Sequence, residues 1–242
     1  MNATAYLRHL KHDGGTLASI AREQPSTRVP TCPEWTLADL LAHVGSAHHW
    51  AEETIRTRAT EFCPFSKPPK DFGAVCAWYD HGLNDLVQTL AAVDPDQPVW
   101  NWQVMGLGPA RFWQRRMAHE TAVHRWDAES SLGVATPVPT DLAVDGIDEY
   151  LGIVSFSLSM KPNEALAGTL GLEATDAPLA YTLTLAPTQV IHQKGHDDAD
   201  AVVRGTSSDL LLWLVGRRTN DDEAIVVEGE RSVIDGWSTV RF

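Results

Sequence analysis

The sequence has few cysteines, and their spacing excludes two common site types. The three cysteines, Cys32, Cys63 and Cys76, cannot all pair with one another and show no CxxC spacing. They therefore indicate neither a disulfide framework nor a thiolate zinc site. We expect each to be a small apolar residue of a protein that folds in a reducing compartment.

Basic residues and long hydrophobic runs are also scarce. The chain has 19 Lys and Arg against 32 Asp and Glu, a formal net charge of −13 at pH 7. No basic cluster offsets this charge, so nucleic acid is not an expected partner. The longest wholly apolar run, Leu210 to Val215, is far shorter than the ~20 residues that span a bilayer. The first residues lack the apolar core of a signal peptide, so we expect a soluble, cytoplasmic protein without a membrane partner.

What is present is the composition of a folded protein with two domains. The 242 residues are 43% hydrophobic and 21% charged, as in ordinary globular domains. The composition changes near residue 135, where helical patterns give way to a mixture of helix and strand signals. We therefore predict an α+β chain with an N-terminal domain at 1–136 and a smaller domain at 137–242.

Four helical segments precede this change. Thr36 is an N-cap candidate with Asp39 as its acidic partner, which predicts the start of the second helix. Gly14 and Gly15 are expected to interrupt or loosen the first. The segments run from about Ala5 to Ile20, Leu37 to Arg58, Ala74 to Val93 and Pro109 to Gly133. They predict a four-helix bundle, with helices alone before about residue 135.

The second half of the chain combines helices with strands. A helix is expected at Asp141–Leu158, and SSDLLLWLVGRR has the capping serines and apolar repeat of a short helix. The runs YTLTLAP and AIVVEGE are typical of strands. We expect strands only after about residue 175 and a small α/β layer domain.

A glutamate and a histidine four residues apart lie in the fourth helical segment. At about 100° per residue, Glu120 and His124 project from one helix face, so both can contact one ion. His119 precedes His124 by five residues and diverges from it by about 140°, so this is not the H-E-x-x-H pattern of zinc proteases. Taken alone, the pair favours an ordinary helix carboxylate bonded to Arg116 or His124.

The second helical segment supplies a third candidate, His43. It lies among the apolar residues of LADLLAHV, so we expect a buried imidazole, which needs a metal or another polar partner. His43, Glu120 and His124 would provide three ligands and leave a position open, as in catalytic rather than structural zinc sites. His48 and His49 share the face of His43 poorly, and we expect them to be supporting or surface residues.

Three stretches of the sequence carry a family resemblance. VPTCPEWTLADLLAHV from Val29, HETAVHRWDAE from His119 and DLLLWLVGR from Asp209 resemble the mycothiol-dependent maleylpyruvate isomerase family of the DinB-like superfamily. The resemblance covers nearly the whole chain. It implies an N-terminal DinB-like four-helix bundle that binds a divalent metal, commonly zinc, and a smaller C-terminal α/β domain with a sterol-carrier-like fold.

The resemblance also implies individual site residues. The family's metal ligands correspond to His43, Glu120 and His124, the three residues that the helix geometry also selects. The family's catalytic arginine corresponds to Arg217, with the neighbouring Arg218 as the alternative. Taken on its own, Arg217 is equally compatible with a cation that stabilises a helix C-terminus.

The implied chemistry is that of a thiol cofactor, mycothiol or a similar small thiol, acting on a small electrophilic substrate. A metal-bound thiol loses its proton, and the resulting thiolate is the nucleophile. In an isomerase the thiolate adds to a cis double bond and leaves after rotation, whereas in an S-transferase it stays attached. The metal residues are the same in both cases, so both reactions stay open, as does the oligomeric state.

Two further hypotheses come from other classes of protein. In a non-catalytic binding protein the bundle would be a scaffold and the α/β domain would hold an apolar ligand. The burial of Trp100 and Trp102 bears on this hypothesis, and we expect both to pack in the core. Two histidines and one carboxylate also bind Fe(II) in non-haem oxygenases, but the helical setting and the family resemblance argue against that class.

Overall fold

The computed structural model describes residues 1–195 and 198–240. The chain divides into two compact units, Met1–Thr136 and Pro137–Phe242. Within the described residues, no helix combines the length and the hydropathy needed to cross a bilayer.

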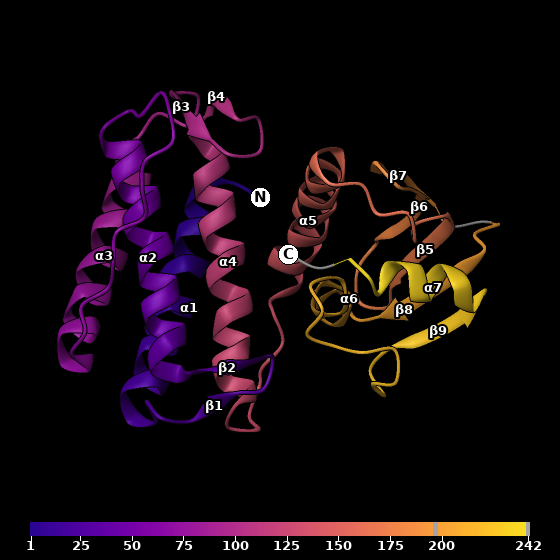
Figure 1. Cartoon of the computed structure of the whole chain (residues 1–242), viewed down its shortest axis with the longest axis horizontal. Helices are drawn as coiled ribbons and strands as arrows, with labels where there is room; N and C mark the ends of the chain where they lie inside the picture. Colours follow the sequence, from indigo (N-terminus) through magenta and orange to yellow (C-terminus); the bar gives the residue numbers. More distant parts are fainter. Residues whose placement is uncertain (196–197, 241–242) are drawn as a thin grey trace. The chain divides into compact units, whose positions relative to one another are not determined.

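The first unit contains the expected four-helix bundle (Figure 1). Helix α1 packs against α4, and α2 packs against α3 and α4. Leucines of three helices, among them Leu10, Leu40 and Leu86, are fully buried in its core. The four helices are α1 (Ala3–Glu23), α2 (Leu37–Arg56), α3 (Phe72–Ala92) and α4 (Arg111–Ser130).

The start of α2 confirms the predicted capping box. The Thr36 hydroxyl accepts a hydrogen bond from the Asp39 N–H at 3.3 Å, and the Asp39 carboxylate accepts one from the Thr36 N–H at 2.9 Å. Each group satisfies a donor that a helix end leaves without a partner. This cap fixes the residue at which α2 begins and therefore which side of the helix presents His43.

The expectation that glycines would interrupt α1 is wrong. The helix is continuous through Gly14 because α3 packs closely against it there. A Cβ atom at residue 14 would lie 2.8 Å from Leu83 Cδ2, and the Gly14 carbonyl accepts a hydrogen bond from the Tyr79 hydroxyl at 3.1 Å. The glycine therefore permits a close helix contact rather than a break.

The expectation of helices alone before residue 135 is also wrong. Two short antiparallel hairpins connect the helices, β1 (Arg28–Val29) with β2 (Cys32–Thr36), and β3 (Pro98–Asn101) with β4 (Gly106–Pro109). These hairpins form hydrogen bonds between the backbone N–H and C=O groups of the segments that connect the helices. Such groups are unfavourable when they are buried without a partner. Strands of two to five residues show no detectable alternation, which is why periodicity did not indicate them.

The second hairpin contains the two tryptophans that bear on the binding-protein hypothesis. Trp100 is buried, and its carbonyl accepts a hydrogen bond from the Trp113 indole at 3.0 Å. Trp102 is half-buried and packs against the same core. Both tryptophans therefore contribute to core packing, as predicted.

The second unit is a mixed sheet with helices, as expected for this half. Its five strands lie in the order β7-β6-β5-β8-β9, with β5 and β8 parallel and the other pairs antiparallel. The elements are α5 (Thr140–Met160), β5 (Gly168–Ala174), β6 (Ala180–Ala186), β7 (Gln189–Lys194), β8 (Ala201–Gly205), α6 (Ser207–Leu214), β9 (Val226–Gly229) and α7 (Arg231–Trp237). Strand β5 begins before residue 175, which corrects the expected onset of strands. The glycines at its first and fourth positions, Gly168 and Gly171, obscure the alternation that predicts a strand.

Candidate metal centre

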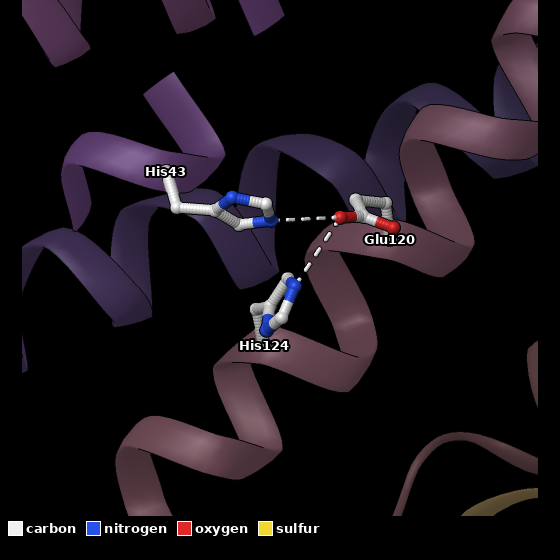
Figure 2. A group of neighbouring side chains, drawn as sticks. All are labelled: His43, Glu120 and His124. Carbon is white, nitrogen blue, oxygen red and sulfur yellow. Dashed lines mark ion pairs between the residues drawn. The ribbon is translucent and has the colours of Figure 1, made fainter. Parts of the chain in front are cut away.

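The structure brings His43 of α2 together with Glu120 and His124 of α4. The Nε2 atom of His43 lies 3.4 Å from Glu120 Oε1, and the Nε2 atom of His124 lies 3.2 Å from the same oxygen. One donor atom from each of the three residues lies within 4.8 Å of the other two. Figure 2 shows both rings directed at the single carboxylate oxygen between them.

Helix geometry explains why Glu120 and His124 lie together, and helix packing explains why His43 joins them. Glu120 and His124 share a face of α4 because they are four residues apart. His43 joins them because α2 packs against α4. The side chain of His43 is 41% exposed, however, which makes the expectation of a buried imidazole wrong. The residue lies at the border between the apolar face of α2 and its exposed face.

Glu120 is held as a carboxylate by its surroundings. Burial opposes ionisation, but the Arg116 guanidinium, with the rings of His124 and His43, outweighs it and holds the pKa of Glu120 well below its usual range. Arg116 forms an ion pair with Glu120 Oε2. The other oxygen, Oε1, is the one that faces the two histidines.

Each ring nitrogen of His124 faces a carboxylate, Nδ1 that of Asp127 and Nε2 that of Glu120. Burial disfavours its protonated form, but hydrogen bonds to Asp127 and Glu120 outweigh this and raise the pKa of His124 to about 9. Its Nδ1 atom lies 2.8 Å from Asp127 Oδ2, so Nδ1 carries a proton and donates it to this bond. Nε2 is therefore the atom that faces Glu120.

The three donor atoms suit a small divalent cation in type, and two of their three separations suit it in spacing. Two imidazole nitrogens and a carboxylate oxygen are ligands that zinc accepts. Tetrahedral zinc with bonds of about 2.0–2.1 Å has ligand atoms roughly 3.4 Å apart. The two measured separations at Glu120 Oε1, 3.2 and 3.4 Å, agree with that spacing.

The other histidines near the motif lie outside this cluster. His48 is fully buried with its Nε2 atom 2.8 Å from the Thr121 hydroxyl, and burial lowers its pKa to about 3. His49 stacks on Trp78 with ring centroids 4.4 Å apart. His119, which the spacing argument separated from His124, packs edge-on against Tyr6.

The arginines at 217 and 218 belong to the second unit and follow α6. Arg218 forms ion pairs with Asp209 at 2.7 Å and Asp222 at 2.7 Å, which gives it a structural partner on each side. Arg217 is half-buried and donates a hydrogen bond to the Val215 carbonyl at 3.0 Å.

Two residues around the cluster were not selected as functional from the sequence. Asp127 follows His124 by three residues, a helical spacing that could have indicated its role. Thr31 donates a hydrogen bond to Asp127 Oδ1 at 2.6 Å, and no sequence signal connects residues so far apart in the chain.

Comparisons with known proteins cover most of the chain. The family model of the mycothiol maleylpyruvate isomerase N-terminal domain matches residues 14–129, and that of the MDMPI C-terminal domain matches residues 141–236. No curated protein sequence matches.

Solved structures show the same fold. A crystal structure of the mycothiol-dependent maleylpyruvate isomerase, in a variant with one histidine replaced by alanine, aligns with a TM-score of 0.62 at 16% identity over 95% of each chain. A second crystal structure of that isomerase aligns with a TM-score of 0.59 at 14% identity, again over 95% of each chain.

Proposed function

The chain belongs to the mycothiol-dependent maleylpyruvate isomerase family, and we propose that it is a metal-dependent enzyme using mycothiol or a similar small thiol to isomerise a small electrophile. The observation that carries this proposal is the convergence of His43, Glu120 and His124 on one point in the bundle. Three ligands with an open position are typical of catalytic metal sites.

In this proposal the three residues hold a divalent ion, for which zinc is the proposed identity. When bound, the ion lowers the pKa of a coordinating thiol so that the thiolate forms near neutral pH. Two neutral imidazoles and one carboxylate compensate only one of the two positive charges. The residues of the site therefore favour an anionic fourth ligand over a neutral one.

The reaction that follows needs no net change in the cofactor. A thiolate held at this site would supply a nucleophile that could add reversibly to an activated cis double bond. Its loss after rotation about the resulting single bond would leave a trans double bond and return the thiol unchanged. We propose that Arg217 binds an anionic group of the substrate or cofactor through its guanidinium.

We also propose a cytoplasmic location and no nucleic-acid partner. Cys32, Cys63 and Cys76 are free thiols in the structure, and a small-thiol cofactor requires a reducing compartment. The net charge of −13 opposes binding to a phosphate backbone.

Product masses test the proposed reaction. The zinc-loaded protein is incubated with mycothiol and a panel of cis-configured electrophiles, with a chelator-treated sample and a thiol-free sample as controls. A geometric isomer of unchanged mass, formed only with both metal and thiol, supports the proposal. A product heavier by the thiol identifies an S-transferase instead. If no electrophile gives a product, the protein is better explained as a binding protein. If the Fe(II)-loaded protein consumes oxygen, it is an oxygenase. Either result overturns the proposal.

A further inference from the structure

The β1–β2 hairpin lies directly before α2 and is fixed to the bundle. Val29 of β1 is fully buried in the bundle core. The Leu37 N–H, at the first residue of α2, donates a hydrogen bond to the Thr27 carbonyl at 2.9 Å. The hairpin therefore occupies a defined position relative to α2 and α4, the two helices that carry the candidate metal ligands.

The turn of this hairpin contacts one candidate ligand through a buried carboxylate. Thr31, between β1 and β2, donates its hydroxyl proton to Asp127 Oδ1 at 2.6 Å. The other oxygen of Asp127 accepts the His124 Nδ1 proton at 2.8 Å. Asp127 is fully buried, so few other orientations are open to its carboxylate. The hydroxyl therefore fixes the carboxylate, and the carboxylate fixes the imidazole ring.

Strand β2 contacts a second candidate ligand directly. The indole of Trp35 lies against the imidazole of His43, with ring centroids 4.7 Å apart and an interplanar angle of 43°. His43 is 41% exposed and therefore has space for other rotamers. The indole covers one face of the ring and limits those rotamers.

We propose that the β1–β2 hairpin positions two of the three candidate metal ligands, His124 through Thr31 and Asp127, and His43 through Trp35. This inference rests on the proposed metal site. A carboxylate on Nδ1 keeps the proton there and leaves the Nε2 lone pair available for a metal, and such outer partners contribute strongly to metal affinity. Thr31, Trp35 and Asp127 are thus positioning residues.

Metal affinity is the first readout, measured by competition with a chromophoric chelator. Thr31→Val keeps the shape of the side chain but removes the donor, and should weaken zinc binding about 10-fold. Thr31→Ser keeps the hydroxyl and should stay within about twofold of wild type. The matched control is Thr89→Val, because the Thr89 hydroxyl also donates a hydrogen bond to a carboxylate, that of Glu52, at 3.3 Å. Glu52 lies about two and a half turns along α2 from His43, so this substitution should leave zinc affinity unchanged.

Double variants distinguish the contact through Thr31 and Asp127 from the contact through Trp35. Thr31→Val added to Asp127→Asn should change the affinity little further, because both act on the same ring. Trp35→Leu added to Thr31→Val should weaken binding by the product of the two single effects. Circular dichroism of each variant verifies that the bundle remains folded.

A second readout needs no metal. In the metal-free protein the His124 Nδ1 proton should give an exchange-protected NMR signal that Asp127→Asn removes and Thr31→Val weakens. An unchanged signal and unchanged zinc affinity in Thr31→Val, with Glu120→Gln still losing affinity, would overturn this inference and leave the proposed function standing. Equal zinc binding by wild type and Glu120→Gln would overturn both.

Discussion

Raising the pH of the metal-free protein from 6.5 to 9.5 should lower its free energy of unfolding through His124. The pKa of this residue rises from 6.5 to about 9 on folding. Its protonated form is therefore stabilised in the native state, so the contribution is present below pH 6.5 and is lost as the pH rises through 9. At about 1.4 kcal/mol per unit, the loss is about 3 kcal/mol.

Urea unfolding of chelator-treated protein at several pH values measures this loss. Asp127→Asn is the comparison variant, because it removes the charged partner of the His124 Nδ1 proton. Its stability should fall less over the same range, so the difference between variant and wild type isolates the contribution of His124. Saturating zinc should also flatten the wild-type profile, because a ligating histidine has already lost its Nε2 proton.

Identical pH profiles for wild type and Asp127→Asn would refute this reasoning. They would mean that the Asp127 carboxylate does not raise the pKa of His124 in the folded protein. A profile that rises with pH over this range would contradict the sign itself.

Three further variants, one of them with a matched control, test the site and the fold. Glu120→Gln keeps the size of the ligand but removes its charge, so zinc affinity should fall by more than about 100-fold. Activity should fall with it. Equilibrium dialysis measures the affinity, and turnover measures the activity. Arg217→Ala should leave zinc bound and lower turnover, and a loss of zinc would contradict the role that we propose for Arg217. Gly14→Ala should destabilise the bundle by about 1–3 kcal/mol through contact with Leu83, whereas Gly15→Ala, which meets no atom within 4 Å, should not lower the melting temperature.

Features within one helix turn could be predicted from the sequence. The Thr36 cap and the pairing of Glu120 with His124 depend on residues three or four apart, so helix geometry alone determines them. The convergence of His43 on this pair required the additional assumption that α2 faces α4. Its exposure could not be predicted, because a residue at the border of an apolar face is buried or exposed according to how the helix is rotated in the bundle.

Features that depend on distant segments could not be predicted. The hydrogen bond between Thr31 and Asp127 joins a hairpin turn to the last turns of α4, and neither segment carries a signal for the other. The hairpin itself is too short for a periodic pattern. The continuity of α1 at Gly14 depends on Leu83 and Tyr79 of α3. The intrinsic helix propensity of glycine does not include such contacts with another helix.

Cobalt substitution tests the central claim, that His43, Glu120 and His124 hold a divalent ion that binds the thiol cofactor. Co²⁺ occupies zinc sites and reports its ligands by its absorption spectrum. We predict one equivalent of bound Co²⁺ and, on addition of mycothiol, a new near-ultraviolet thiolate-to-cobalt charge-transfer band that Glu120→Gln lacks. Absence of stoichiometric binding, or a spectrum that mycothiol leaves unchanged, would contradict the account.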